Sequence, residues 1–285
     1  MKVLLYGKGW LGTIFANMCS ERGHNIVYGG RVENIKDVEK EIVSVEPDRV
    51  VSMIGRTHGT GYKTIDYLEQ KGKLVENIND NLYAPLILAN VCKELGVHLT
   101  YLGTGCIFSY SEDKDIFYEE DLPNFFGSSY STVKGFTDRL MHDIYNDTVL
   151  NVRIRMPIHS VPNSRNFIDK IVSYTKICSV PNSMTVIDDL FPLLVDMMES
   201  KRIGTINLCN KGTITHNDIL NMYKDIIDPT HTWKNILYDE QMQFLSADRS
   251  NNELDSSSLD QLGVPDIFTS VKRCMDKYKE HLSQR

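Results

Sequence analysis

The sequence lacks the features that mark a nucleic-acid binder or a membrane protein. Its 285 residues hold 31 Lys and Arg against 38 Asp and Glu, with no basic run, whereas a protein that grips a phosphate backbone needs a basic surface. The longest apolar stretches are strand-sized, far short of the ~20 residues of a membrane span. At the N-terminus, Lys2 leads into a strand and a glycine turn instead of the apolar core of a signal peptide. We therefore expect a cytoplasmic protein that binds neither nucleic acid nor membrane.

Cysteine and histidine are too scattered to predict a metal site. The six cysteines include no C-x-x-C pair, and the eight histidines include no pair at ligand spacing. Common zinc motifs and disulfide frameworks both require such spacings. We predict a protein without a metal.

Short β-branched runs alternate with amphipathic stretches through the first half, a pattern typical of a parallel sheet with helices on both faces. After Met156-Pro157 the spacing becomes irregular. We predict an α/β fold, with a Rossmann-type doubly wound parallel sheet over residues 1–156 and a smaller substrate-binding domain over 157–285. Segments at about 187–210 are expected to return to the sheet. The predicted strands cover residues 2–6, 25–28, 49–53, 98–102, 149–154 and 205–208, and the predicted helices cover 10–22, 35–45, 62–70, 79–95, 128–145 and 267–281.

Three glycines at G-x-G-x-x-G spacing, Gly7, Gly9 and Gly12, lie between the first predicted strand and the first predicted helix. Glycines there let the backbone approach a pyrophosphate, and the positive end of the helix attracts its charge. This loop, with Trp10 and Leu11, is therefore expected to bind a dinucleotide. The alternative is a tight strand-to-helix turn without a ligand.

The second predicted strand lacks the terminal carboxylate that binds the ribose 2′-hydroxyl of NAD. It is followed by Gly29, Gly30 and Arg31, and a guanidinium group pairs with the oxygens of a 2′-phosphate. We predict NADPH/NADP as the cofactor, with Arg31 at the 2′-phosphate. A solvated loop charge is the alternative for Arg31.

Tyr130 and Lys134 have the spacing of a tuned proton donor, because a lysine one helical turn away favours the tyrosinate form. The motif is weak by itself, since pairs beginning at Tyr67 and Tyr110 repeat it. Position favours Tyr130, whose helix follows the fourth strand and can face the carboxyl ends of the strands, where ligands bind. Tyr67 is expected in ordinary sheet packing or in solvent, and Tyr110 in an acidic loop. The fourth strand leads to Thr104, whose hydroxyl is expected to share a substrate carbonyl oxygen.

The glycine loop, Thr104 and the pair Tyr130 and Lys134 together resemble the extended short-chain dehydrogenase/reductases. Longer blocks resemble the plant-type bifunctional UDP-4-keto-6-deoxyglucose 3,5-epimerase/4-reductases, which make UDP-L-rhamnose. The resemblance to the bacterial dTDP-4-dehydrorhamnose reductases, which only reduce, is more distant. The glycine loop has one residue fewer before its second glycine than the family's G-x-x-G-x-x-G. The blocks lie at residues 104–108, 119–125, 127–131, 153–158, 165–168, 181–185 and 249–253.

This resemblance implies two chemistries at one site. It implies that Cys106 and Lys170 exchange protons at C5 and C3 of a 4-keto sugar, and that Thr104, Tyr130 and Lys134 assist reduction at C4. From the sequence alone, Cys106 would be a packed thiol and Lys170 a solvated charge.

The resemblance also implies binding roles for residues outside these five. Asn81 is expected to hold Lys134 through a water. One group is expected to line the cofactor ribose and the sugar, and a second to bind the uridine diphosphate, with structural loop roles as the alternative for its asparagines. These groups are Gly55, Arg56 and Thr57, and Asn166, Asn182, Arg249 and Asn252, respectively.

The predicted function is therefore the NADPH-dependent conversion of UDP-4-keto-6-deoxy-D-glucose to UDP-L-rhamnose by 3,5-epimerisation and 4-keto reduction. One alternative is a 4-reductase alone, acting on a dTDP- or UDP-linked sugar. A further alternative is a non-catalytic NADP-binding regulatory subunit. The sequence prefers UDP without fixing the nucleotide, and a homodimer through helices 79–95 and 128–145 is expected by analogy.

Overall fold

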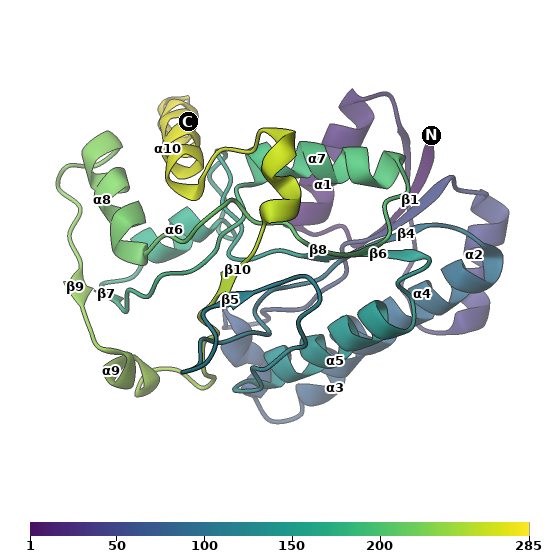
Figure 1. Cartoon of the computed structure of the whole chain (residues 1–285), viewed down its shortest axis with the longest axis horizontal. Helices are drawn as coiled ribbons and strands as arrows, with labels where there is room; N and C mark the ends of the chain where they lie inside the picture. Colours follow the sequence, from purple (N-terminus) through teal and green to yellow (C-terminus); the bar gives the residue numbers. More distant parts are fainter. Residues whose placement is uncertain (285) are drawn as a thin grey trace.

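A parallel sheet of six strands forms the centre of the computed structural model, which describes residues 1–284 (Figure 1). The strand order is β2-β1-β3-β4-β6-β8, and Leu4 of β1 is in register with Val27 of β2 and Val50 of β3. The sheet therefore has a topological switch point between β1 and β3, which confirms the predicted Rossmann-type fold. The strands are β1 (Lys2–Tyr6), β2 (Asn25–Tyr28), β3 (Arg49–Ser52), β4 (Leu99–Leu102), β6 (Val149–Arg153) and β8 (Gly204–Asn207).

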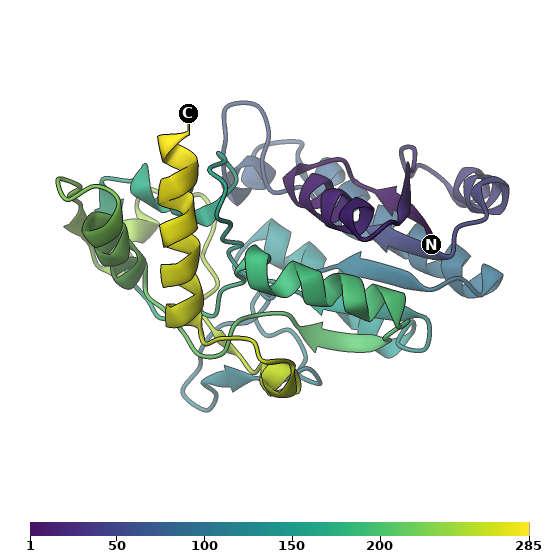
Figure 2. The same cartoon turned by 90° about the horizontal axis from the view of Figure 1, so that it is seen from above.

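Helices cover both faces of this sheet, which explains why the strands β3, β4 and β6 at its centre are buried throughout. On one face, α1 (Trp10–Glu21) and α7 (Ile187–Glu199) lie side by side (Figure 2). Between them, Phe15 meets Phe191 edge to face, with ring centroids 6.2 Å apart. The other face carries α2 (Ile35–Val45), α4 (Ala84–Leu95) and α5 (Ser129–Asp143). Two separate apolar cores result, one on each side of the sheet.

The helix predicted at 62–70 is wrong. Gly59 and Tyr62 instead form a β-bridge, and only a short 3₁₀ helix, η1 (Ile65–Glu69), follows. Gly61 has a φ of 81°, a left-handed conformation that interrupts a helix. The segment after β3 is therefore a loop that can reach over the edge of the sheet.

The helix predicted to begin at residue 79 begins five residues earlier. It starts as α3 (Leu74–Ile78) and passes through a π-helical turn, η2 (Asn79–Tyr83), into α4. Asn77 and Asn81 are both buried within this continuous helical segment. π-helical turns of this kind are frequent at functional sites.

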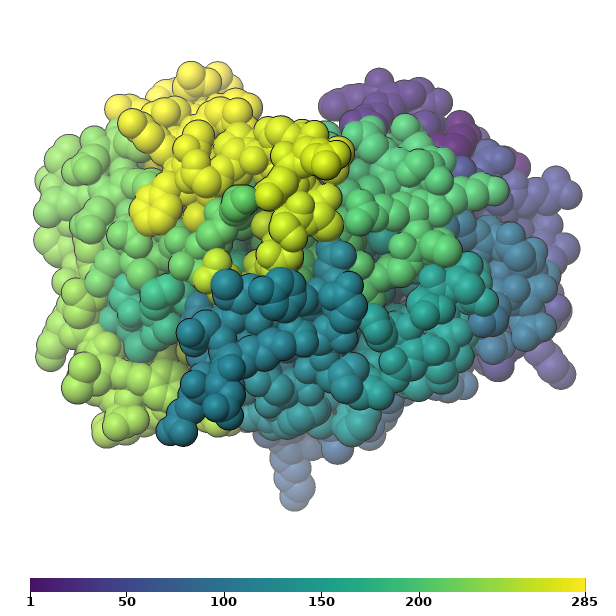
Figure 3. Space-filling view, viewed as in Figure 1, coloured from purple at the N-terminus to yellow at the C-terminus, as the bar shows by residue number. Residues whose placement is uncertain are grey.

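A second lobe packs beside the sheet around its own apolar core, which includes Ile168, Ile219 and Met275. The lobe joins the sheet where β5 pairs with β10, and these two segments meet on the face seen in Figure 3. No helix within residues 1–284 is long and apolar enough to cross a bilayer. The remaining elements are β5 (Ile116–Phe117), α6 (Phe167–Val172), β7 (Lys176–Ile177), α8 (His216–Ile226), β9 (Lys234–Asn235), α9 (Tyr238–Met242), β10 (Glu253–Leu254), η3 (Ser257–Leu262) and α10 (Ile267–Ser283).

Candidate active site

A cavity of about 460 Å³ lies between the sheet and the second lobe, beyond the carboxyl ends of β1, β3, β4 and β6. This is the position at which ligands bind in open α/β sheets. Segments far apart in the sequence meet there, from the glycine loop to the loop before β10. The predicted site residues that line it are Gly9, Trp10, Leu11, Gly12, Gly55, Thr57, Thr104, Cys106, Tyr130, Lys134, Lys170 and Arg249.

The glycine loop packs too tightly for side chains at two of its three glycines. Gly7 has a φ of 100°, and a Cβ there would lie 2.7 Å from the carbonyl carbon of Met53; one at Gly12 would lie 2.0 Å from the carbonyl oxygen of Gly7. Gly9 faces open space and begins α1, which, within the described chain, has no side-chain cap and no acidic residue in its first turn. The backbone N–H groups of that turn can therefore hold a pyrophosphate despite the shortened loop.

The corner beyond β2 carries two cations that do not line the cavity. The side chain of Arg31 is 73% exposed and lies 3.3 Å from Glu33, and Lys8 in the glycine loop lies 4.9 Å from the ring centroid of Tyr28. Glu41 of α2 is also at this corner, where its carboxylate accepts hydrogen bonds from the backbone N–H of Gly30 at 2.9 Å and from a tyrosine hydroxyl. Sequence reasoning did not find Lys8 or Glu41.

Asn81 fixes the loop that follows β3. Its side-chain oxygen accepts the N–H of Arg56 at 2.9 Å, and its side-chain nitrogen donates to the carbonyl of Arg56 at 2.9 Å and to Asn77 at 2.8 Å. The guanidinium group of Arg56 turns away from the cavity to Asp80. This arrangement positions Gly55 and Thr57, which do line the cavity.

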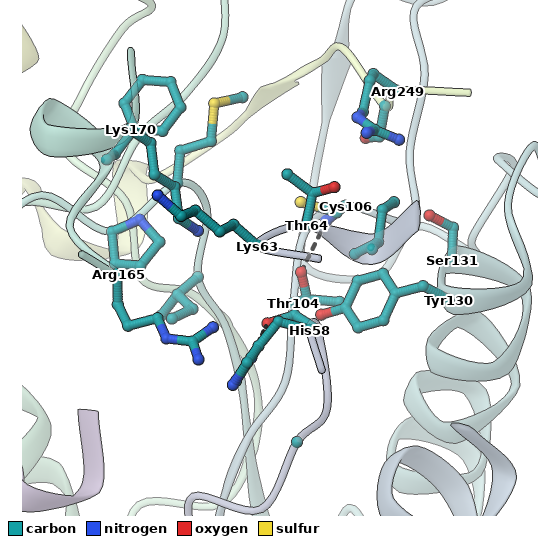
Figure 4. A pocket seen from close by; sticks show the side chains of 18 of the residues that line it. His58, Lys63, Thr64, Thr104, Cys106, Tyr130, Ser131, Arg165, Lys170 and Arg249 are labelled. Carbon is teal, nitrogen blue, oxygen red and sulfur yellow. Dashed lines mark hydrogen bonds between the residues drawn. The ribbon is translucent and has the colours of Figure 1, made fainter. Parts of the chain in front are cut away.

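Tyr130 enters the cavity from the first turn of α5. The helix begins there because the Ser128 hydroxyl accepts the N–H of Ser131 at 3.0 Å. Tyr130 is hydrogen-bonded to Thr104, whose hydroxyl also accepts the N–H of Cys106 at 3.1 Å (Figure 4). Burial and the nearby Cys106 raise the pKa of Tyr130, and the hydrogen bond with Thr104 offsets this only in part. Tyr130 therefore holds its proton and can act as an acid.

Lys134 lies one turn further along α5 and donates to the hydroxyl of Tyr101 on β4. Only 3% of Lys134 is exposed. Burial lowers its pKa to about 7, although Asp138 and Cys106 act in the opposite direction. The amine can thus gain or lose a proton near neutral pH.

Cys106 and Lys170 face the same cavity from different lobes. Cys106 follows β4, and Lys170 comes from α6; Figure 4 shows Lys170 on the opposite side of the pocket from Tyr130. Burial and the charge of Arg165 lower the pKa of Lys170, whereas Cys106 raises it in part. The cavity therefore contains a thiol, a phenol and two lysine amines, which are four groups that can transfer protons.

Arg249 reaches the cavity from the loop before β10 and is held by Asp66 of η1. The guanidinium donates to the carboxylate of Asp66 and, at 2.8 Å, to the carbonyl of Ala247, while the N–H of Ser246 donates to the same carboxylate at 2.8 Å. Burial raises the pKa of Asp66, but hydrogen bonds and Arg249 more than offset this and hold it below its usual range. Arg249 is thus aimed by a residue that sequence reasoning missed.

The three predicted asparagines Asn166, Asn182 and Asn252 do not line the cavity. Asn166 caps α6, where it accepts the N–H of Ile168. Asn252 donates to the carbonyl of Gly105 at 3.0 Å, and its own N–H donates to Asn182 at 3.0 Å. In the structure these side chains hold the loops that carry Lys170, Cys106 and Arg249.

Two buried arginines at the end of β6 differ in their partners. Arg153 forms an ion pair with Asp138 at 2.7 Å. Arg155, by contrast, has no carboxylate at ion-pair distance among residues 1–284 and donates instead to the carbonyl of Gly105, to the side chain of Asn182 and to Ser250, at 2.6–3.2 Å. One guanidinium group therefore ties together the cavity loop and two loops of the second lobe.

Several residues at the site have contacts that their sequence motifs do not predict. Tyr67 is an example: its ring packs in a cluster with Tyr130, instead of in ordinary sheet packing or solvent, and its hydroxyl donates to Glu76 at 2.8 Å. Tyr101 and Asp66 act through Lys134 and Arg249, so only tertiary contacts reveal them.

Comparisons with known proteins identify the family. The L780 protein of Acanthamoeba polyphaga mimivirus is 52% identical over 98% of this chain and 99% of its own. The crystal structure of L780, a UDP-rhamnose synthase, has a TM-score of 0.94 and covers 97% of this chain and 99% of that one. A bifunctional dTDP-4-dehydrorhamnose 3,5-epimerase/reductase of Arabidopsis thaliana is 40% identical over 96% of this chain and 91% of its own. The chain belongs to the UDP-rhamnose synthase and dTDP-4-dehydrorhamnose reductase family.

More distant structures share the fold of this family. A dTDP-4-dehydrorhamnose reductase from Bacillus anthracis, solved in complex with NADP, is 16% identical with a TM-score of 0.76 and covers 95% of this chain and 97% of its own. A scan against family models gave no match. The protein is thus an enzyme of the UDP-rhamnose synthase family with the fold of a Rossmann-type reductase.

Proposed function

We propose that this enzyme converts UDP-4-keto-6-deoxy-D-glucose to UDP-L-rhamnose by 3,5-epimerisation followed by NADPH-dependent reduction at C4. The observation that carries the proposal is the composition of the cavity. Cys106 and Lys170 line the same cavity as Thr104, Tyr130 and Lys134, so groups for both reactions surround one substrate position.

The epimerisation needs a base and an acid beside a ketone. The C4 carbonyl acidifies the protons on C3 and C5, and removal of either proton gives an enolate. Cys106 and Lys170 are proposed to take a proton from one face of the sugar and return one to the other, so that each centre is inverted without net loss of a proton. The lowered pKa of Lys170 supports this role, because a neutral amine is a base.

The reduction needs a proton at the C4 oxygen when hydride arrives at C4. NADPH, when bound, supplies that hydride. Tyr130 is proposed to donate the proton while the Thr104 hydroxyl holds the same oxygen. Protonated Lys134 stabilises the tyrosinate that results, and Tyr101 orients the amine.

The nucleotide-binding ends of the cavity support these assignments. The uncapped first turn of α1 suits the pyrophosphate of the cofactor, and Arg31 and Lys8 are the cations at the corner expected to receive a 2′-phosphate. Arg249 is proposed to bind the diphosphate of the sugar nucleotide, for which UDP is preferred.

Isotope exchange tests this proposal directly. The pure protein is incubated in deuterium oxide with UDP-4-keto-6-deoxy-D-glucose and no NADPH, and the sugar is then analysed by NMR. We expect deuterium at C3 and C5, followed by formation of UDP-L-rhamnose when NADPH is added. Absence of deuterium together with reduction of an already epimerised sugar would favour a reductase alone. Absence of both activities would favour a non-catalytic NADP-binding subunit.

Substitution of Cys106 separates the two reactions. Cys106→Ala should abolish the deuterium exchange but leave reduction of an epimerised sugar measurable, because Tyr130 and Thr104 are intact. Loss of both activities in this variant would contradict separate roles.

A further inference from the structure

The side chains that line the cavity include several cations. Among the described residues that line it there is no Asp or Glu, although the whole chain has a formal net charge of −7. Four of these cations are accounted for: Lys134, Lys170 and Arg249 have proposed roles, and Lys176 lies 3.5 Å from Glu240. The full set is Lys63, Lys134, Arg165, Lys170, Lys176 and Arg249. Lys63 and Arg165 therefore need a separate explanation.

Lys63 and Arg165 come from different lobes and meet at the mouth of the cavity. Lys63 lies in the loop after β3, and Arg165 lies just before α6. With His58, Tyr62 and Ser164 they line a second hollow of about 310 Å³, and Lys63, Arg165 and His58 line the main cavity as well. Figure 4 shows Lys63 and Arg165 on the same side of the pocket as Lys170, with His58 between Arg165 and Tyr130.

Within residues 1–284, the side chains of Lys63 and Arg165 have neither an ion pair nor a hydrogen bond. This distinguishes them from Arg249, which is paired with Asp66. Arg165 is partly buried, so water solvates its charge less fully than that of an exposed arginine. Two unpaired cations that line one hollow are suited to bind an anion.

The neighbouring groups respond to this uncompensated charge. Burial and the charges of Arg165 and Lys170 lower the pKa of His58 to about 4, so that its ring is neutral at pH 7. Burial also lowers the pKa of Arg165, and that of Lys170 is lowered by burial and by Arg165. A bound anion would relieve this repulsion, while neutral His58 keeps an N–H that can donate to it.

We propose that Lys63, Arg165 and His58 form a phosphate clamp across the two lobes, separate from the glycine loop and from Arg249. The ligand is a phosphate group of a nucleotide. This phosphate belongs either to the dinucleotide cofactor or to the sugar nucleotide, and in naming these two molecules the proposal rests on the proposed function. Because one cation comes from each lobe, occupancy draws the loop after β3 toward α6 and closes the mouth of the cavity.

Binding measurements on three variants test the clamp. Arg165→Gln and Lys63→Gln each remove one cation of the clamp, and Lys211→Gln is the matched control, because Lys211 is exposed and paired with Asp260 outside the cavity. The dissociation constants of NADPH and of UDP are measured by calorimetry at low and high salt, and circular dichroism checks folding. The test measures binding alone and does not depend on catalytic turnover.

We expect Arg165→Gln to weaken the binding of one of the two nucleotides by ~10-fold, which is the size typical of a charge-assisted contact. The binding of that nucleotide should also become less dependent on salt. Lys63→Gln should weaken the binding of the same nucleotide by a smaller factor, because Lys63 is exposed. Loss of NADPH affinity identifies the cofactor as the source, and loss of UDP affinity identifies the sugar nucleotide. The control should bind both as the wild type does.

Two other outcomes are distinguishable. If the wild type binds NADPH and UDP and both folded variants bind them equally well, the clamp is refuted while the proposed function stands. If the wild type binds neither nucleotide, the proposed function fails, and the clamp fails with it.

Discussion

Replacing Lys134 by Met should stabilise the protein at neutral pH while abolishing reduction. The amine is 3% exposed, and burial moves its pKa from 10.5 to about 7. At ~1.4 kcal/mol per pKa unit, this corresponds to about 5 kcal/mol lost from the folded state when the amine is protonated in both states. The variant leaves the Tyr101 hydroxyl without its partner, which costs about 1–3 kcal/mol. A net gain of about 2–4 kcal/mol follows.

The pH dependence of this gain is the decisive feature. The folded state has the lower pKa, so the cost of Lys134 is complete below pH 7, decreases between pH 7 and 10.5, and vanishes where the amine is neutral in both states. Urea unfolding of the ligand-free wild type, Lys134→Met and the exposed control Lys211→Met, at pH values from 6 to 10, measures it. Adding Tyr101→Phe to Lys134→Met should stabilise further, because it removes the unpaired hydroxyl. A variant less stable than the wild type at pH 7, or a difference that does not shrink with rising pH, would refute the reasoning.

Two further predictions concern the substrate end and assembly. Asp66→Asn should raise the KM for the sugar nucleotide by ~3–10-fold at little cost to kcat, because Arg249 loses its ion pair but the reacting groups remain; an unchanged KM in steady-state kinetics would mean that Asp66 does not aim Arg249. Exposed apolar side chains on the α3 to α5 face, including Val75 at 64% and Phe136 at 58%, favour the expected homodimer. Light scattering should show that Phe136→Glu shifts the mass toward that of the monomer, whereas Ile203→Glu, on the edge of the sheet, does not. Equal masses for the two variants would argue against this interface.

The sheet could be predicted because its signals are local. The central strands are short, mostly apolar runs that are buried, and the glycine loop lies at a fixed place between β1 and α1. The helix predicted at 62–70 failed because apolar spacing does not register the left-handed turn at Gly61. The start of α3 was missed because Asn77 is polar in the sequence, whereas in the structure it is buried and accepts a hydrogen bond from Asn81, which holds the loop after β3.

The candidate site was only partly predictable for a similar reason. Cys106, Tyr130 and Lys170 stand in motifs, and the structure places them around one cavity. Asp66 and Tyr101 act by aiming another side chain, and such partners are set by tertiary packing alone. Lys63 and Arg165 lie far apart in the sequence, and only the placement of the two lobes brings both of them to one hollow.

The guanidinium group of Arg155, which is hydrogen-bonded but has no ion pair within the described chain, has a consequence for how this sequence can change. It satisfies acceptors at Gly105, Asn182 and Ser250, which lie in three segments remote from one another in the chain. Loss of the side-chain acceptor of Asn182 or of Ser250 leaves a buried donor unpaired, so the free energies of substitutions at these two positions are not additive. In a double-mutant cycle Asn182→Ala and Ser250→Ala should show a coupling energy, and substitutions at these positions are tolerated as a set instead of one at a time.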